Sequence, residues 1–290
     1  MSTSTSVALS ANVHPTAMVD ATAQLHPAAV VHPYAIIGKQ CVVGANCVIY
    51  SHAVLEPFVT LEEGCTVHSG AVLGGVPQDR KFKGEYSTVR IGKNTIIREC
   101  ATVHRASGEG LKTVVGENCF LMAYSHVGHN SVLANDVTLA NSVQIAGHVE
   151  IEQFVTIGGG TVVHQGVKIG SYAMIGGFSA VRQDVPPFSL ISEVPARIAG
   201  LNIVGLRRNN FTATDRKQLN KAFRVLFSSP APLAEKLAHA EAEFADAPLV
   251  QQVITFIKNS NRGLCGVKNI RKTVEGLSYS DEQPEAGSFH

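Results

Sequence analysis

The sequence has no tryptophan, few charged residues and no long hydrophobic run. Only 16% of its 290 residues are charged, against roughly 25% in an average soluble domain, and 24 Lys and Arg nearly balance 23 Asp and Glu. Nucleic-acid-binding proteins usually carry a marked basic excess, so this balance argues against that class. No apolar stretch approaches the roughly 18 residues of a membrane-spanning helix, and the first residues lack the basic and apolar regions of a secretory signal. We therefore expect a cytoplasmic protein without a membrane span.

Aliphatic residues recur at every sixth position over most of the chain. In the first run the third residue of each hexad is aliphatic, from Val13 to Leu73, and a small residue stands two places before it. The same frame returns at Ile91 and runs again from Val115 to Val181. The three runs contain eleven, three and twelve hexads. So regular a spacing indicates a repeat architecture.

A period of six fits neither an α-helix nor a coiled coil. It fits a β-solenoid in which each hexad is one short strand and one turn, and three hexads close a triangular coil. Coils stack at about the 4.8 Å spacing of hydrogen-bonded strands, so these hexads build a prism of roughly eight to nine coils. The sequence therefore predicts an all-β parallel β-helix, a hexapeptide-repeat solenoid, over residues 11–189. The spacing does not determine its handedness.

The hexad rhythm stops at Pro186 and Pro187, and helical spacing follows. Thr212 followed by Asp215 has the form of a helix start. The expected helices are 212–228, 232–246 and 248–260, each with an apolar face. We interpret residues 190–278 as a C-terminal α-helical domain that covers the last coil, and the acidic residues 279–290 as a flexible tail.

Four of the six cysteines occupy the small interior place of a hexad. They are Cys41, Cys47, Cys65 and Cys119, whereas Cys100 and Cys265 lie outside that frame. Cysteine at such a place packs as a small buried residue. Cys47 and Cys65 are 18 residues apart and should stack on neighbouring coils, so a disulfide is sterically possible. Without an export signal we expect reduced thiols.

The interruptions of the rhythm are candidate functional loops, because a regular prism leaves chemistry to outward positions and loops. Residues 75–86 read GVPQDRKFKGEY, where Asp79 and Lys81 place a carboxylate and an ammonium two residues apart. Such a pair suits sugar hydroxyls or phosphate. A solvated loop carries the same residue types, so these residues alone leave both interpretations open.

Histidines gather after the second interruption. His126 and His129 flank the inward Val127, so both rings should point out of the prism. One column, spaced by 18 residues, contains His129, Gly147 and Gln165, and His148 and His164 lie beside it. A histidine beside a glycine whose N–H is open suits acyl transfer, because the imidazole takes a proton from a hydroxyl and the N–H stabilises the oxyanion.

Histidine can have two other roles in such a sequence. Histidines at other hexad turns are expected only to fill those turns; they are His14, His26, His32 and His68. Neutral imidazoles also bind zinc, and a zinc carbonic anhydrase class uses this type of fold. No cysteine or carboxylate completes a ligand set here, so we expect no metal and no cofactor.

Several motifs appear in the order found in the UDP-N-acetylglucosamine O-acyltransferases that begin lipid A synthesis. They are VHPTA, QDRKFKGE, VHR, HVGH, AGHV, VVHQ, QDVPP, NIVGLRR and SNRGL, from Val13 to Leu264. The chain resembles this family over nearly its whole length. The resemblance implies a left-handed parallel β-helix with a C-terminal α-helical domain. It also implies a homotrimer with active sites between neighbouring prisms.

The resemblance further implies the reaction and the roles of single residues. A (R)-3-hydroxyacyl chain would pass from acyl carrier protein to the 3-hydroxyl of UDP-N-acetylglucosamine. His129 is similar in place to the general base, and Gly147 to the oxyanion donor. The implied substrate contacts are Asp79, Lys81, His126, His148, His164, Gln165, Asn202 and Arg208. Gly177 matches the position that limits acyl length, and a glycine there implies a long chain.

An acidic carrier protein needs a basic docking surface. Residues 197–224 contain seven Lys and Arg against one Asp, so we expect docking there. Three residues depart from the family pattern. Asn130 follows the base where the family commonly has Asp, Val204 replaces an acid, and Asn209 replaces a second arginine after Arg208.

Three alternatives stay open at this point. The same base and oxyanion site would serve N-acyl transfer to a 3-amino analogue of the sugar nucleotide. The fold is also compatible with a zinc-dependent hydratase. A non-catalytic scaffold would keep its function when His129 is lost, whereas the enzyme would lose orders of magnitude in rate.

Overall fold

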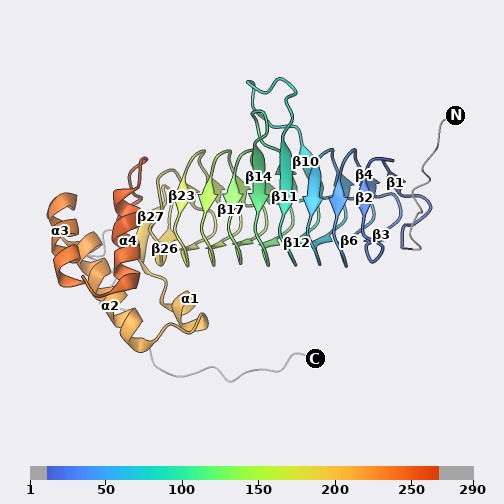
Figure 1. Cartoon of the computed structure of the whole chain (residues 1–290). Coiled ribbons are helices and arrows are strands. Elements are labelled where there is room, and N and C mark those ends of the chain that lie inside the picture. The colour runs from blue at the N-terminus through green and yellow to red at the C-terminus, as the bar shows by residue number, and fades with distance from the viewer. Residues whose placement is uncertain (1–11, 268–290) are drawn as a thin grey trace.

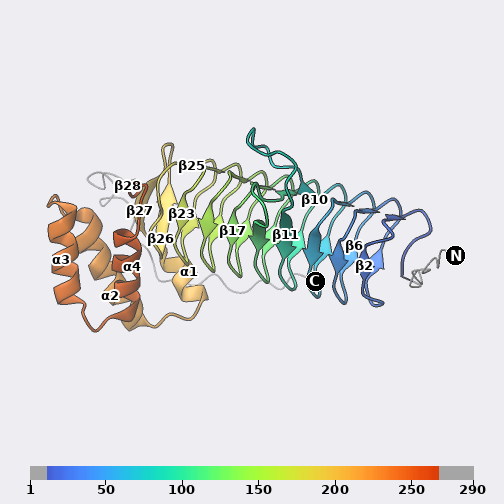
Figure 2. The same cartoon turned by 45° about the horizontal axis from the view of Figure 1, so that its top comes forward.

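The computed structural model describes residues 12–267. Short parallel strands wind into a long three-sided prism, and helices gather beyond its C-terminal end (Figure 1). A view turned about the horizontal axis shows the strands stacked along the prism, with an extended loop leaving it near β10 and β11 (Figure 2). The predicted β-helix followed by helices is confirmed.

The prism has three faces. Along each face, neighbouring strands are three strands apart in the chain, except at the C-terminal end of face three. Face one contains β1 (Met18–Val19), β4 (Ile36–Ile37), β7 (Val54–Leu55), β10 (Val72–Gly75), β13 (Thr102–His104), β16 (His126–Val127), β19 (Gln144–Ile145), β22 (Val162–Val163) and β25 (Ala180–Val181). Face two contains β2 (Gln24–Leu25), β5 (Val42–Val43), β8 (Val59–Leu61), β11 (Thr88–Ile91), β14 (Lys112–Val115), β17 (Val132–Leu133), β20 (Glu150–Ile151) and β23 (Lys168–Ile169). Face three contains β3 (Val30–Val31), β6 (Val48–Ile49), β9 (Thr66–Val67), β12 (Ile96–Ile97), β15 (Phe120–Leu121), β18 (Thr138–Leu139), β21 (Thr156–Ile157), β24 (Met174–Ile175), β26 (Ser189–Ser192), β27 (Arg197–Leu201) and β28 (Gly266–Val267).

Three corners join these faces. The first corner lies between faces one and two and includes residues 128–131, 146–149 and 164–167. The second corner lies between faces two and three and includes residues 134–137 and 170–173. The third corner lies between faces three and one and includes residues 158–161 and 176–179.

The aliphatic places of the hexads form the core. From Val31 to Val181 each of these side chains is buried, and residues 18 apart stack directly, as Val127 does on Ile145. Full burial of one such side chain stabilises the fold by roughly 1.5–3 kcal/mol. Val13, Val19 and Leu25 are half-buried because, within the described chain, no coil precedes theirs. The hexad prediction is thus confirmed along the prism.

Both interruptions are loops that leave the first corner; the pairing of β10 with β13 shifts register between Leu73 and Gly75, just before the loops begin. Loop 76–87 joins β10 to β11, and loop 105–111 joins β13 to β14. After the first loop Ile91 pairs with Leu61, and after the second Val127 pairs with Val103, so aliphatic residues still stack on aliphatic residues. The loops therefore add surface to one corner while the stacking of the aliphatic side chains in the core continues.

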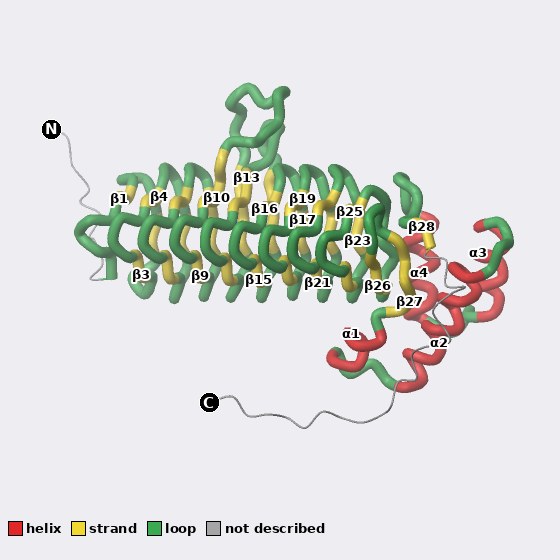
Figure 3. Tube along the Cα trace, turned by 180° about the vertical axis from the view of Figure 1, so that it is seen from behind, coloured by secondary structure: helices red, strands yellow, loops and turns green. Residues whose placement is uncertain are grey.

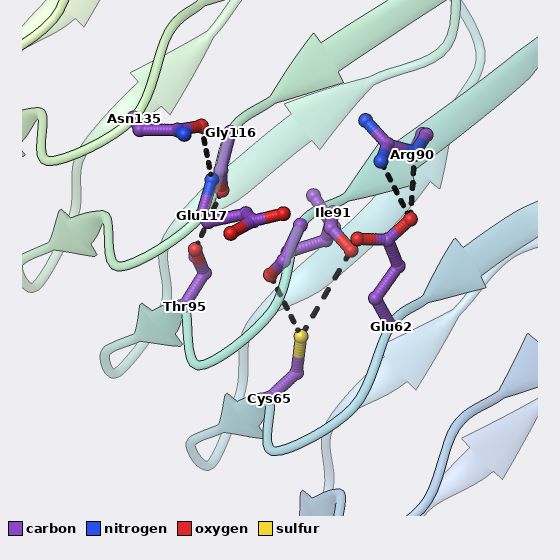
Figure 4. A network of polar contacts seen from close by, with 9 residues as sticks. Glu62, Cys65, Arg90, Ile91, Thr95, Gly116, Glu117 and Asn135 are labelled. Atoms are coloured by element: carbon purple, nitrogen blue, oxygen red, sulfur yellow. Dashed lines mark hydrogen bonds and ion pairs between the residues drawn. The ribbon is translucent and has the colours of Figure 1, made fainter.

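Polar contacts at the second corner join one coil to the next (Figure 4). The Cys65 thiol donates to the carbonyl oxygen of Gly92 at 3.1 Å, and the Thr95 hydroxyl donates to that of Gly116 at 2.7 Å. All six cysteines are free, and the four at small hexad places are buried as predicted. Burial raises the pKa of Cys119 to about 11, so this thiol stays protonated.

A β-hairpin follows the last coil, α2, α3 and α4 gather beyond this end of the prism, and α1 lies to one side of it (Figure 3). The helices are α1 (Ile203–Arg208), α2 (Ala213–Phe223) with a π-helical turn η1 (Arg224–Ser228), α3 (Leu233–Glu243) and α4 (Pro248–Lys258). Thr212 and Asp215 form the predicted capping box of α2. The three expected helices are confirmed. No helix within residues 12–267 is long and apolar enough to cross a membrane.

The start of the expected helical region is wrong. Residues 190–201 belong to the hairpin of β26 and β27 rather than to helices, and α1 precedes the first expected helix. The reason is that β24 leaves an open strand edge on face three, which β26 pairs in parallel. The expected tail, residues 279–290, lies outside the described residues.

Candidate active site

Loops 76–87 and 105–111 contact each other above the first corner. The Ser107 hydroxyl donates to Asp79 Oδ2 at 2.9 Å, and the Gly108 N–H donates to Glu85 Oε1 at 2.8 Å. The Lys81 N–H donates to Asp79 Oδ1, also at 2.9 Å. These hydrogen bonds hold the pKa of the Asp79 carboxyl below its usual range, so a carboxylate is present at neutral pH. Asp79 is half-buried and the Lys81 side chain is exposed.

His129 lies on the first corner directly beneath these loops. Its carbonyl oxygen accepts the N–H of His148 at 2.9 Å, and that of Gly147 accepts the N–H of Gly166 at 3.0 Å. Backbone hydrogen bonds therefore connect the coils of His129, Gly147 and Gln165, which occupy one corner as their spacing predicts.

The imidazole of His129 is oriented by Asn130. His129 Nδ1 lies 2.7 Å from Asn130 Oδ1, which also accepts the N–H of Ser107 at 2.9 Å. Asn130 Nδ2 donates to the Ser107 carbonyl oxygen at 3.0 Å, so the amide orientation follows from its two partners. Because Oδ1 can only accept, His129 Nδ1 must donate, and Nε2 of the neutral ring keeps its lone pair.

Gly147 lies against that free nitrogen. A Cβ built on Gly147 would lie 2.6 Å from His129 Nε2, so any side chain at this position would collide with the ring. The N–H of Gly147 has no hydrogen-bond partner among residues 12–267. A lone pair and an open donor therefore meet at one point of the corner.

Three further histidines surround His129. The rings of His129 and His148 meet edge to face at 5.1 Å, and those of His104 and His126 at 4.7 Å. Burial, aided by the neighbouring His104 and His129, lowers the pKa of His126 to about 4. Burial also lowers the pKa of His104 and of His148. These three rings are thus neutral at pH 7 and act as hydrogen-bonding groups rather than as charges.

Arg105 lies at the base of loop 105–111. Its guanidinium is 5.1 Å from the ring centre of Phe82 and 5.6 Å from that of Phe58. Arg105 Nε and His104 Nδ1 are buried and have no hydrogen-bond partner among the described residues. Roles for His104, Arg105 and Ser107 were not assigned from the sequence, although the VHR motif and the interruption beginning at Arg105 marked the segment.

The other predicted contacts are not all gathered here. His164 and Gln165 lie on the first corner, two coils beyond His129. Asn202 caps α1 and donates to the Tyr172 carbonyl oxygen at the second corner, at 2.9 Å. Arg208 ends the same helix, and Gly177 lies on the third corner. One chain therefore distributes the predicted residues over three corners.

The basic stretch 197–224 is partly neutralised. Lys221 pairs with Glu243 of α3, an acid outside the stretch, and Arg216 donates to the Phe211 carbonyl oxygen. The exposed Arg207 and Arg208 lie in the last turn of α1, where the helix dipole favours positive charge. In residues 12–267, no cluster of three or more His, Cys, Asp or Glu is arranged to hold a metal ion.

Comparison with known proteins identifies the family. The family model described as UDP N-acetylglucosamine O-acyltransferase, domain 2, matches residues 184–265, and the bacterial transferase hexapeptide model matches residues 22–57, 40–75 and 112–147. An acyl-[acyl-carrier-protein]--UDP-N-acetylglucosamine O-acyltransferase of Nautilia profundicola is 42% identical over 198 residues, 68% of this chain and 76% of that protein. A Synechocystis protein of the same name is 42% identical over 66% of this chain and 69% of its own length.

Solved structures agree with this result. The UDP-N-acetylglucosamine acyltransferase of Campylobacter jejuni is 37% identical, with a TM-score of 0.83 over 88% of this chain and all of that one. The Bacteroides fragilis enzyme is 33% identical, with a TM-score of 0.85 over 87% and 99% of the two chains. The fold is thus a left-handed parallel β-helix with C-terminal helices. The chain belongs to the UDP-N-acetylglucosamine O-acyltransferase family.

Proposed function

We propose that this protein transfers a (R)-3-hydroxyacyl chain from acyl carrier protein to the 3-hydroxyl of UDP-N-acetylglucosamine, the first step of lipid A biosynthesis, in the cytoplasm. The names of its relatives support the two substrates. One observation carries the chemistry: Nε2 of His129, the ring nitrogen that does not face Asn130, lies beside Gly147, whose N–H has no hydrogen-bond partner among residues 12–267.

His129 is the general base of this proposal. With Nδ1 donating to Asn130, Nε2 is free to take the proton of the sugar hydroxyl as the oxygen attacks the thioester carbonyl. The imidazolium that forms then returns the proton to the departing thiolate. Among the nearby groups, the carboxylate of Asp79 favours the positive charge that develops on His129.

Gly147 is the proposed oxyanion donor. As the carbonyl carbon becomes tetrahedral its oxygen gains negative charge, and a backbone N–H that has no other partner among residues 12–267 can donate a hydrogen bond to that oxygen without reorganisation. Glycine is required because the ring of His129 occupies the place of a side chain. The base and the donor are then within one coil of each other, which suits attack and charge stabilisation at the same carbonyl.

We propose that the remaining contacts complete the site in a homotrimer. Asp79, Lys81, His126 and His148 surround the base in one chain and would hold the sugar. Asn202, Arg208 and Gly177 lie at the other two corners, so they reach a first corner only if it belongs to a neighbouring prism. Gly177 places no side chain at its position, which favours a long acyl chain, and the basic residues of 197–224 would receive the carrier protein.

Product mass tests this function. The purified protein is mixed with UDP-N-acetylglucosamine and 3-hydroxyacyl carrier proteins of several lengths, beside His129→Ala and the control His26→Ala. His26 is an exposed turn histidine whose ring contacts only a backbone N–H of the described chain. We expect one added hydroxyacyl group and a rate about 10²- to 10⁴-fold lower in His129→Ala alone.

The proposal fails if the wild-type protein is active and His129→Ala keeps its rate within tenfold. A parallel reaction with the 3-amino analogue distinguishes the acceptor. Product with the amine and none with the hydroxyl sugar would make the enzyme an N-acyltransferase.

A further inference from the structure

Two arginines and a histidine form a cationic cluster at the C-terminal end of the first corner. His164 follows β22, and Arg182 occupies the same place one coil later, after β25. Arg262 arrives from the segment after α4 and donates from its guanidinium to His164 Nδ1 at 3.1 Å. We refer to these three residues as the corner cluster. Neither arginine has been given a role by the reaction described above.

A buried carboxylate places Arg262 on this corner. Asp184 is 1% exposed, and its Oδ2 accepts the Ser260 hydroxyl at 2.7 Å while its Oδ1 accepts the Lys168 N–H at 2.8 Å. Its backbone N–H donates to Gly263 and its carbonyl oxygen accepts the N–H of Cys265, both at 2.9 Å. The segment that carries Arg262 is therefore fixed on both sides of the arginine.

The contact with His164 determines the state of that ring. A guanidinium can only donate, so His164 Nδ1 accepts and the ring proton lies on Nε2. The same nitrogen lies 3.1 Å from the Gln165 carbonyl oxygen, a contact that would need the other tautomer. The charge-assisted bond is the stronger of the two. Arg262 thereby leaves the Nε2–H of a neutral His164 available as a donor.

The positive charge of the cluster is not neutralised. Among residues 12–267 no carboxylate lies within ion-pair distance of Arg182 or Arg262, and both side chains are exposed. Asp184 is close in sequence, but both of its oxygens already accept hydrogen bonds. An arginine held by a buried anchor, yet without an acid partner, is suited to an anion from outside the chain.

The cluster lies in line with the proposed reaction centre. Arg262 Nη1 would be 3.7 Å from a Cβ on Gly166, which stands on the coil after Gly147 and two coils after His129. Two strand spacings, about 10 Å, therefore separate the coil of Gly166 from the coil of His129. A substrate that reacts at His129 and extends along this corner therefore passes the guanidinium of Arg262 and reaches the coil that carries Arg182.

We propose that the corner cluster binds a phosphate group of a substrate, with Arg262 as its principal ligand. This inference rests on the proposed function, in which both substrates carry phosphate. The phosphate is either the diphosphate of the sugar nucleotide or that of the phosphopantetheine arm of the carrier protein. Arg262 offers a planar pair of donors that matches phosphate oxygens, Arg182 adds a second charge, and His164 adds a neutral donor.

Calorimetric binding without turnover tests the proposal. The probes are UDP and 4′-phosphopantetheine, titrated into the full-length wild type, Arg262→Ala, Arg262→Lys and the double variant Arg182→Ala/Arg262→Ala. Lys39→Ala is the matched control, since Lys39 is an exposed cation at the other end of the first corner. Melting curves of each variant verify that it is folded.

We expect Arg262→Ala to lower the affinity for one probe tenfold or more and to make its binding less dependent on salt than in the wild type. Arg262→Lys should recover part of the affinity. Loss for UDP assigns the diphosphate, and loss for phosphopantetheine assigns the carrier arm. A double variant that binds both probes within twofold of the wild type overturns the proposal, as does a wild type that binds neither. The two proposals can also fail separately. If Arg262→Ala loses binding but the wild type makes no acylated product, the proposed reaction is overturned and the phosphate site is retained.

Discussion

The amide of Asn130 holds the ring of His129, the proposed base, without adding a charge. Many other non-glycine residues in the described chain also have a positive φ, among them Tyr34, His52 and Phe178, so the backbone does not require asparagine there. What distinguishes Asn130 is its set of partners: His129, both main-chain groups of Ser107, and the Thr113 hydroxyl, which accepts the Asn130 N–H at 2.9 Å. The residue therefore orients the imidazole and ties it to loop 105–111.

A carboxylate at this position should change the pH dependence of the reaction. Asn130→Asp brings a negative charge next to His129 Nδ1, which favours the imidazolium, and an imidazolium cannot act as base. We expect the acid limb of the profile of kcat/KM to move to higher pH by about one unit. The other groups that face His129 are His104 and His126 on face one, His148 on the next coil and Asp79 in the loop.

Asn118→Asp is the control for this measurement. Asn118 occupies the same turn place with φ of 54°, and its side chain contacts Asn94 rather than a histidine. Profiles recorded from pH 5 to 9 should coincide for this variant and the wild type. If the Asn130→Asp profile superimposes on the profiles of the wild type and Asn118→Asp, Asn130 does not control the protonation of His129.

Spacing alone places part of this site. His129, Gly147 and Gln165 follow from the 18-residue repeat, because the repeat fixes which residues stack. The contacts of Asn130 with Ser107 and of Arg262 with His164 bridge 23 and 98 residues. They depend on how a loop folds back and on where the chain returns after α4, and no local pattern encodes either.

Each coil of the prism stabilises its neighbours through one aliphatic layer. Leu139 in β18 is 0% exposed, whereas Leu25 in β2 occupies the same hexad place and is half-buried. Leu139→Ala should lower the free energy of unfolding by roughly 2–5 kcal/mol, since it leaves a cavity between two coils. Leu25→Ala should cost about half as much, since less apolar surface is lost.

Denaturant midpoints of the two variants measure this difference. Because Leu139 faces the interior behind face three, the folded variant should keep the wild-type rate. Equal midpoints for Leu139→Ala and Leu25→Ala would contradict the layer model of stability.

Sequence predicts the elements that have a periodic or capped pattern, and it misses α1 and the hairpin of β26 and β27. Hexads predict the strands, and Thr212 with Asp215 predicts the start of α2. The hairpin of β26 and β27 follows two prolines and has no repeat of its own. It forms because it completes the open edge of face three, a tertiary cause that a local reading cannot detect.

At the scale of the whole molecule, the proposed homotrimer is the assembly that would bring three corners together. Asn202 and Arg208 are anchored at the second corner by α1, while the base lies on the first. The protein should therefore have three times its 30.8 kDa chain mass in solution, as light scattering can determine.

Mixed assemblies test whether neighbouring chains share a site. His129→Ala and Arg208→Ala chains are each expected to have low activity, and co-expression should restore part of it, because some sites then combine an intact base with an intact α1. Activity no higher than the sum of the separate variants would place both residues in a site of one chain.

The backbone bonds that link His129 to His148 and Gly147 to Gly166 belong to the ladder that holds the prism together. The backbone spacing between His129, the proposed base, and Gly147, the proposed oxyanion donor, is consequently the repeat of a β-sheet, a dimension that side-chain substitutions elsewhere do not alter. Such a centre has no hinge of its own. Heat should inactivate the site only when the β-helix unfolds, so the half-life of the activity should equal the half-life of the folded protein.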